Sequence, residues 1–170
     1  LEIPATHTTP DPVELNNLLR QMVDAGCEYC FMEVSSHAIH QNRVAGLDYK
    51  IAVFSNITHD HLDYHKTFKD YIYAKKLFFD HLSSNAIAIT NIDDANGMVM
   101  VQNTKAKIRT LALQTVADYK AKILENTFLG LILNINKHEV YTHLVGGFNA
   151  YNLLTVYAVA IELGKDEMEV

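Results

Sequence analysis

The sequence is poor in the features that mark secreted, membrane-bound and nucleic-acid-binding proteins. Its two cysteines, Cys27 and Cys30, are too few for a disulfide framework and fit a reducing cytoplasm. No apolar run reaches the roughly 18 residues that span a membrane, and no stretch has the pattern of a signal peptide. The formal net charge of -6 argues against a general nucleic-acid binder, but it leaves room for a local positive pocket that binds an anion.

What the sequence does contain is typical of one globular domain. Its 170 residues are 49% hydrophobic and 20% charged, which is enough to bury one full core. It starts at Leu1 rather than Met, and it ends at Val170 among charged residues that resemble the start of another element. We therefore expect the chain to be a piece of a longer protein.

Helical periodicity and strand-like apolar runs alternate along the first two thirds of the chain. Asp11 is expected to cap the first helix, and Thr67 is expected to open a later one with Asp70 as its capping partner. This alternation predicts a parallel sheet covered by helices. The expected helices cover residues 11–25, 67–82, 94–103 and 148–163, and the expected strands cover residues 29–34, 51–55, 86–90 and 107–113.

The pattern changes near residues 119–145, where β-rich pieces alternate between polar and apolar residues. Residues 119–124, 127–135 and 139–144 are expected to be antiparallel strands at one edge of the sheet. The predicted fold class is therefore α/β, with three layers: a mostly parallel sheet flanked by helices and a small antiparallel appendage.

An unusual density of metal-binding side chains directly follows the strand predicted at residues 51–55. Ligands in open α/β sheets bind beyond the carboxyl ends of the strands, and imidazoles and carboxylates suit a divalent cation. The alternative interpretation is a polar loop with solvated histidines. Its five candidate ligands are His59, Asp60, His61, Asp63 and His65.

Residues 33–43 combine a carboxylate with groups that bind anions. Glu33 closes an apolar run, where it needs a partner or a metal unless it simply caps the next turn. Ser35, Gln41 and Arg43 follow closely, and arginine offers a fork that suits a carboxylate or a phosphate. The alternative for Arg43 is an ordinary surface arginine.

Two further segments lie at the starts of predicted helices. Thr8 and Thr9 precede the first helix, whose N-terminus favours anions, although plain capping by Asp11 explains that stretch as well. Asn149 and Asn152 share one face of the last helix after a pair of glycines, where an amide can recognise a base edge. The alternative for Asn149 is N-capping.

Lys75 and the Cys27–Cys30 pair have plainer local interpretations. Lys75 lies in an apolar helix, from which its side chain is expected to reach solvent. The two cysteines have redox or zinc spacing, but no second pair completes a zinc site and they enter a predicted strand. We therefore expect Cys27 and Cys30 to be buried core residues.

Together and in this order, the segments resemble the central, ATP-using domain of the Mur ligases, and most closely the tripeptide-synthetase members of that family. The resemblance covers about residues 6–164 of the sequence. Its most specific element is Asp-His-Leu-Asp-Tyr-His. The matching motifs are Thr8-Thr9-Pro10-Asp11, Glu33-Val34-Ser35-Ser36-His37, Asp60-His61-Leu62-Asp63-Tyr64-His65, Ala74-Lys75 and Gly147-Phe148-Asn149 with Asn152.

The resemblance implies an ATP-dependent amide ligase of peptidoglycan synthesis, acting in the cytoplasm without nucleic acid or membrane insertion. ATP would phosphorylate the terminal carboxylate of UDP-N-acetylmuramoyl-L-alanyl-D-glutamate. The amine of a diamino acid, meso-diaminopimelate or L-lysine, would then attack the acyl phosphate. Because two anions must meet, magnesium and cationic groups must screen them.

The resemblance also implies roles for individual residues. Glu33 and His61 correspond to magnesium-linked residues, and Lys75 corresponds to a lysine that becomes carbamylated and so turns from a cation into an anion. Asn149 and Asn152 would lie near ATP. The contacts to the uridine-nucleotide substrate would be Thr8, Thr9, Ser35, Gln41 and Arg43.

The sequence departs from the family pattern in several places. The phosphate-binding Gly-x-Gly-Lys-Thr loop, expected upstream of Thr8, has no counterpart here. His59 stands where relatives often have Arg, and Lys66 stands where Gly is common. The uridine-binding and amino-acid-selecting domains are also expected outside residues 1–170, so we expect this central ATPase domain to be inactive alone.

Three other functions fit parts of the pattern. One is a related ligase such as folylpolyglutamate synthase, against which the set of Ser35, Gln41 and Arg43 argues. Another is a metal-dependent hydrolase built on the His/Asp segment. The third is a binding module without catalytic activity.

Overall fold

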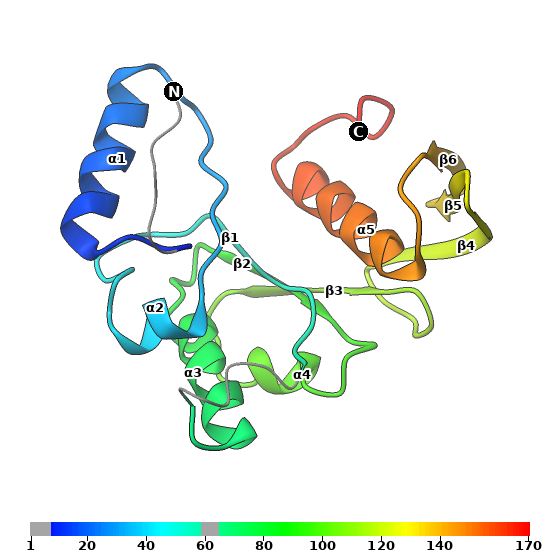
Figure 1. The fold of residues 1–170 in the computed structure, drawn as a ribbon. Helices are drawn as coiled ribbons and strands as arrows, with labels where there is room; N and C mark the ends of the chain where they lie inside the picture. Colours follow the sequence, from blue (N-terminus) through cyan, green and yellow to red (C-terminus); the bar gives the residue numbers. More distant parts are fainter. Residues whose placement is uncertain (1–7, 59–64) are drawn as a thin grey trace. The chain divides into compact units, whose positions relative to one another are not determined.

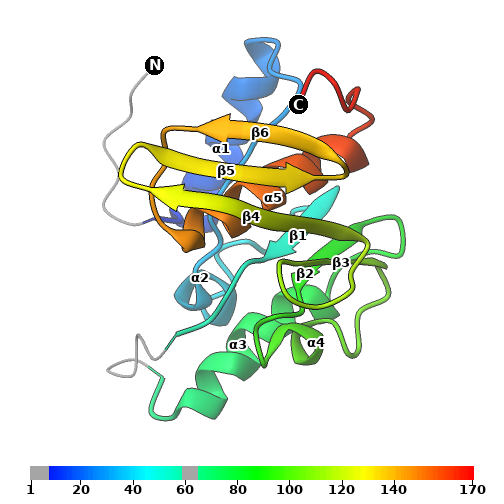
Figure 2. The same ribbon diagram turned by 90° about the vertical axis from the view of Figure 1, so that its right-hand side faces the viewer.

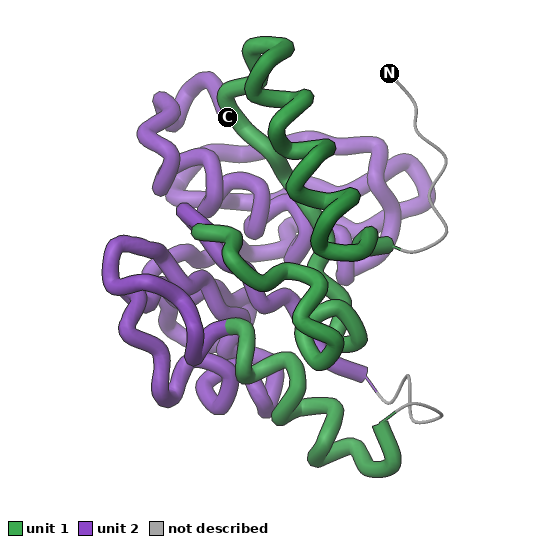
Figure 3. The backbone as a smooth tube through the Cα atoms, turned by 90° about the vertical axis from the view of Figure 1, so that its left-hand side faces the viewer, with its two compact units in different colours: residues 1–48, 60–78 green, residues 49–59, 79–170 purple. Residues whose placement is uncertain are grey.

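The computed structural model describes residues 8–58 and 65–170, which form two compact units. Unit 1 comprises residues 1–48 and 60–78, and unit 2 comprises residues 49–59 and 79–170 (Figure 3). His61, the predicted magnesium ligand, lies outside the described residues together with the rest of residues 59–64.

Unit 2 is built on a six-stranded sheet in the order β1-β2-β3-β4-β5-β6 (Figure 2). The first four strands are parallel, and β4, β5 and β6 are antiparallel to one another. The α/β class, the mostly parallel sheet and the antiparallel appendage are thus confirmed. The strands are β1 (Ile51–Phe54), β2 (Ile87–Asn91), β3 (Lys107–Ala112), β4 (Tyr119–Thr127), β5 (Gly130–Ile135) and β6 (His138–Thr142).

The helix α5 (Gly147–Glu162) packs on this sheet and closes the core of unit 2 (Figure 1). Its buried residues Ala150, Leu154 and Ala158 recur every four residues, so that one stripe of the helix faces the core. Ile89 of β2 and other buried strand residues complete the cluster. The short helix α4 (Gly97–Met100) follows β2, and the buried Thr90 hydroxyl donates a hydrogen bond to the Gly97 carbonyl at 2.8 Å.

Unit 1 holds α1 (Pro12–Asp24), α2 (Ser36–His40) and most of α3 (Phe68–Asp80). The predicted capping by Asp11 is confirmed, because its carboxylate accepts hydrogen bonds from the N–H groups of Val13 and Glu14. The Thr67–Asp70 pair is confirmed as well: the Thr67 hydroxyl donates to the Asp70 carboxylate at 2.7 Å and accepts from the Asp70 N–H at 3.1 Å.

Residues 29–34 are not the buried strand that their apolar pattern predicted. They are irregular, and Tyr29 and Phe31 are 46% and 75% exposed. A strand needs a neighbour for its backbone N–H and C=O groups, and none of the described strands pairs with this segment. Cys27 and Cys30 are exposed free thiols in the same stretch, so the expectation that they belong to the core was wrong.

Candidate functional site

Thr9 is the structural centre of the predicted substrate-binding residues in unit 1. Its side chain is buried, and its hydroxyl donates a hydrogen bond to the Glu33 carbonyl at 3.0 Å. The Arg43 guanidinium donates to the Thr9 carbonyl at 3.0 Å. These bonds join three stretches of chain that are 24 and 34 residues apart in sequence. Thr8, the neighbour of Thr9, is exposed.

Ser35, Gln41 and Arg43 flank the short helix α2. The Ser35 hydroxyl caps this helix by accepting a hydrogen bond from the Ala38 N–H at 3.1 Å. The Arg43 Nε donates to the Gln41 side-chain oxygen at 2.8 Å. Its bonds to Gln41 and Thr9 hold the partly exposed guanidinium in one orientation.

Lys75 lies on α3 in the same unit as Glu33. Its ammonium nitrogen is 5.4 Å from the centroid of the Tyr71 ring, within the range of a cation–π contact. Burial lowers the pKa of Lys75, and the Glu33 carboxylate partly opposes this shift. A lowered pKa raises the share of the neutral amine, which is the nucleophilic form of lysine.

His65 is the described member of the His/Asp segment, and it lies among aromatic side chains. It is buried, and its Nε2 is 2.8 Å from the Ser36 hydroxyl oxygen. Its ring stacks on Tyr71 at 5.3 Å and lies 5.5 Å from the His37 ring. His65 thus connects α2 to α3 within unit 1.

The described residues do not bring together a complete set of magnesium ligands. Within residues 8–58 and 65–170, no three His, Cys, Asp or Glu side chains gather as a metal would require. Glu33 contributes an exposed carboxylate close enough to Lys75 to influence its pKa. An oxygen donor of this kind suits magnesium, which commonly takes one or two protein carboxylates and completes its shell with water and phosphate.

Asn149 and Asn152 lie on the first turns of α5 in unit 2. The Asn149 amide nitrogen donates to the Val145 carbonyl at 2.8 Å. The Asn152 amide nitrogen donates to the Asn149 side-chain oxygen at 3.1 Å. Asn149 therefore anchors the pair, and Asn152 is the more exposed of the two.

The turn after β2 contains Asp93, whose carboxylate accepts several hydrogen bonds and which the sequence analysis missed. The Asp93 carboxylate accepts a hydrogen bond from the Tyr151 hydroxyl at 3.0 Å. Burial would raise the pKa of Asp93, but the hydrogen bonds it accepts outweigh burial and lower the pKa to about 2. The signal was the Asn-Ile-Asp-Asp run at a strand's carboxyl end. Asp93 also accepts bonds from the N–H groups of Leu113, Gln114 and Thr115 at 2.7, 2.9 and 3.0 Å.

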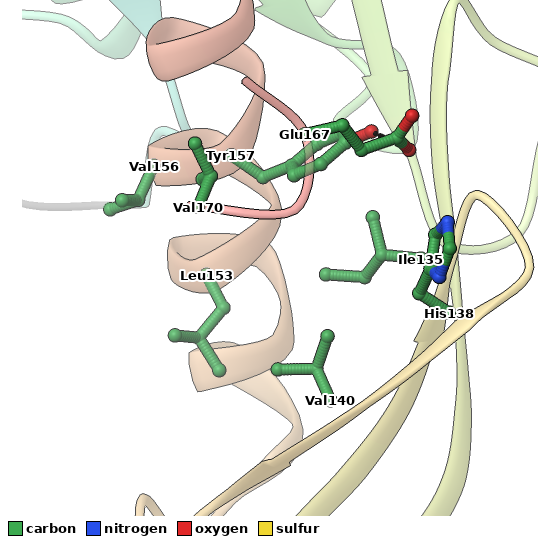
Figure 4. A pocket seen from close by; sticks show the side chains of 8 residues that line it. All are labelled: Ile135, His138, Val140, Leu153, Val156, Tyr157, Glu167 and Val170. Carbon is green, nitrogen blue, oxygen red and sulfur yellow. Dashed lines mark hydrogen bonds between the residues drawn. The ribbon is translucent and has the colours of Figure 1, made fainter. Parts of the chain in front are cut away.

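A pocket in unit 2 lies between α5 and the β5–β6 hairpin (Figure 4). Its lining is mainly aliphatic, and it contains none of the predicted site residues. Tyr157 and Glu167 form its polar end, where the tyrosine hydroxyl donates to the carboxylate at 2.6 Å. The lining residues are Ile135, His138, Val140, Leu153, Val156, Tyr157, Glu167 and Val170.

Comparison with known proteins identifies the class to which this fold and these motifs belong. Residues 2–160 match the family model described as the Mur ligase middle domain. The chain therefore belongs to the Mur ligase family, as the sequence motifs predicted.

Individual relatives narrow the comparison to one branch of the family. The chain is 58% identical over 168 residues to the UDP-N-acetylmuramoyl-L-alanyl-D-glutamate–2,6-diaminopimelate ligase of Parabacteroides distasonis, and 41% identical over 167 residues to that of Bacillus licheniformis. These alignments cover 99% and 92% of the chain. The chain spans 35% and 34% of the two relatives, so it corresponds to about a third of their length.

Solved structures agree with the sequence comparison. A structure of a UDP-N-acetylmuramoyl-L-alanyl-D-glutamate–2,6-diaminopimelate ligase matches 98% of this chain and 36% of its own, with a TM-score of 0.85 and 32% identity. The MurF ligase from Thermotoga maritima, in complex with ADP, matches 96% of this chain and 39% of its own, with a TM-score of 0.61 and 18% identity. The second match shows a shared fold.

Among residues 8–58 and 65–170, no helix has the length and hydropathy needed to cross a membrane.

Proposed function

We propose that the protein to which this chain belongs is an ATP-dependent ligase that adds 2,6-diaminopimelate to UDP-N-acetylmuramoyl-L-alanyl-D-glutamate. The observation that carries the proposal is the match of 99% of the chain, at 58% identity, to a relative with this name. Four further relatives with the same name are 52 to 56% identical over the same length. Diaminopimelate is thereby preferred to L-lysine. A cytoplasmic location belongs to the proposal, because ATP is a substrate and both cysteines are free thiols.

In this proposal, the site for the uridine-nucleotide substrate lies in unit 1 and is built from Thr8, Thr9, Ser35, Gln41 and Arg43. The oriented guanidinium of Arg43 supports the proposal, since a fixed fork matches a carboxylate or a phosphate. Thr9 is buried and its hydroxyl is engaged within unit 1, so its contribution is to hold the segments of Glu33 and Arg43 together.

Lys75 and Glu33 form the proposed ionic centre. The neutral amine of Lys75 would add to carbon dioxide, lose a proton and become a carbamate, which is an anion. The burial that lowers the pKa of Lys75 supports this step, because only the unprotonated nitrogen has a lone pair to donate. Glu33 and His61 would hold magnesium, which screens the charge between the ATP phosphates and the substrate carboxylate.

Asn149 and Asn152 are proposed to contact ATP from unit 2. Their amides are hydrogen-bonded to each other and to the Val145 carbonyl, which gives the exposed Asn152 side chain a defined orientation. A preorganised amide binds a ligand at a lower entropic cost than a free one.

The test is an assay of ADP release by the full-length protein. We expect release that requires both the UDP-muramoyl dipeptide and 2,6-diaminopimelate, with L-lysine giving a much lower kcat/KM. ADP release that requires L-lysine, with no release when 2,6-diaminopimelate is supplied instead, would overturn the choice of amino acid. Release of phosphate from ATP without either co-substrate, or no ADP release at all, would contradict the ligase assignment.

A further inference from the structure

The end of β2 and the turn that follows it form hydrogen bonds to two other stretches of unit 2. The Asn91 side chain donates to the Ser55 carbonyl after β1 at 2.8 Å, and the Asp94 carboxylate accepts from the Ile57 N–H at 3.0 Å. On the other side, Asp93 accepts the three backbone N–H groups of residues 113–115, which follow β3. The turn therefore ties together the segments that leave three neighbouring parallel strands at their carboxyl ends.

The Asp93 carboxylate also reaches α5. The Tyr151 hydroxyl donates to it at 3.0 Å, across 58 residues of sequence. The pKa of Asp93 is about 2. The pKa of Tyr151 is raised, mainly by burial and secondly by the hydrogen bond to Asp93. At neutral pH the bond therefore joins an ionised carboxylate to a protonated phenol, which is a strong, charge-assisted arrangement.

Tyr151 lies between Asn149 and Asn152 in sequence, on the first turns of α5. The buried stripe of Ala150, Leu154 and Ala158 fixes which face of α5 packs on the sheet. These apolar contacts are non-directional, so they do not by themselves set the orientation of the polar side chains at the start of α5. The bond from Tyr151 to Asp93 supplies a directional contact at the end of α5 that carries the two asparagines.

We propose that Asp93 and Tyr151 are positioning residues for ATP, whose hydrogen bond sets the orientation of the Asn149–Asn152 pair relative to the strand ends. The inference rests on the proposed function, because it assumes that the two asparagines face the nucleotide. Asp93 acts through Tyr151 and does not touch the ligand: Tyr151 and residues 113–115 already donate to its two oxygens.

The test compares two tyrosine-to-phenylalanine variants of the full-length protein. Tyr151→Phe removes the hydroxyl that donates to Asp93. Tyr157→Phe is the matched control, because it removes a hydroxyl on the same helix that donates to Glu167 at 2.6 Å. For Tyr151→Phe we expect the KM for ATP and its Kd to rise roughly fivefold to tenfold. The kcat and the KM for the UDP-muramoyl substrate should stay within about twofold. Tyr157→Phe should leave all four values unchanged within the same margin.

Thermal unfolding of both variants separates positioning from stability. If Tyr151→Phe lowers the melting temperature while the KM and Kd for ATP stay at the wild-type values, the bond is purely structural and the inference is wrong. An equal rise in the KM for ATP in Tyr157→Phe would contradict it as well. Wild-type protein that neither bound nor hydrolysed ATP would overturn the proposed function and this inference together.

Discussion

At the scale of single residues, Thr9 links the predicted substrate site through one buried hydroxyl. We expect Thr9→Val to lower the free energy of unfolding by about 1–2 kcal/mol, because the Glu33 carbonyl loses its donor inside the protein. The KM for the UDP-muramoyl substrate should rise in the same variant. Thr9→Ser keeps the hydroxyl and should restore both values. Urea denaturation and steady-state kinetics of the full-length protein measure these effects, and a normal KM in Thr9→Val would contradict them.

Lys75 gives the second prediction at this scale. Arginine keeps a positive charge at all accessible pH values and cannot form the proposed carbamate. We expect Lys75→Arg to lower kcat on the order of 100-fold or more, as for other losses of transition-state charge stabilisation. Lys69→Arg is the matched control, because Lys69 is exposed on the same helix and should tolerate the change. Near-normal kcat in Lys75→Arg would show that catalysis does not require a carbamate at this position.

At the scale of elements, α4 packs so closely on the end of β2 that it requires a glycine. A Cβ at Gly97 would lie 1.9 Å from the Asn91 carbonyl oxygen, which belongs to the backbone and cannot turn away. We expect Gly97→Ala to lower the free energy of unfolding by roughly 3 kcal/mol or more. In Gly164→Ala the new Cβ meets no atom within 4 Å, so only the backbone strain of a φ of +81° remains, at about 1 kcal/mol. If urea denaturation showed equal losses of unfolding free energy in Gly97→Ala and Gly164→Ala, this packing argument would be contradicted.

The hydrogen bonds that the Asp93 carboxylate accepts predict a dependence of stability on pH. The folded-state pKa of Asp93, about 2, is below the ordinary value of 3.8, so ionised Asp93 stabilises the fold fully above about pH 4. This stabilisation is lost as the pH falls through about 2. We expect Asp93→Asn to cost about 2 kcal/mol at pH 7, and the difference from wild type to shrink steadily below pH 4.

Urea denaturation between pH 7 and pH 2 measures this difference. Asp48→Asn, at an exposed aspartate of unit 1, is the control and should stay within about 0.5 kcal/mol of wild type. A difference for Asp93→Asn that remains constant down to pH 2 would show that its carboxylate is not the stabilising group.

The elements also show what the sequence could predict. The strands of the sheet and the helices α1, α3 and α5 were found because periodicity and capping residues are local signals. Residues 29–34 carried the apolar run of a strand, but strand formation depends on a partner that local sequence does not specify. The five-residue helix α2 is too short for helical periodicity to appear.

The residues of the candidate site stay a prediction from motifs, and the bonds between them could not be predicted from the sequence. Motifs pointed to Thr9, Glu33 and Arg43, whereas the bonds that join them cross 24 and 34 residues of sequence. The bond from Tyr151 to Asp93 spans 58 residues and has no local signal beyond an acidic turn after a strand. Side-chain chemistry can be read from short motifs, but contacts at these separations depend on the fold.

At the scale of the whole molecule, the proposed ligase uses ATP to activate the substrate carboxylate as an acyl phosphate. The full-length protein should be incubated with ATP, 2,6-diaminopimelate and UDP-muramoyl dipeptide in which both oxygens of the terminal carboxylate are ¹⁸O. When the amine displaces phosphate, the carboxylate oxygen that was phosphorylated leaves with the phosphate. We therefore predict one ¹⁸O atom in each phosphate released, measured by mass spectrometry. Product formation with unlabelled phosphate would contradict the acyl phosphate and with it the proposed mechanism.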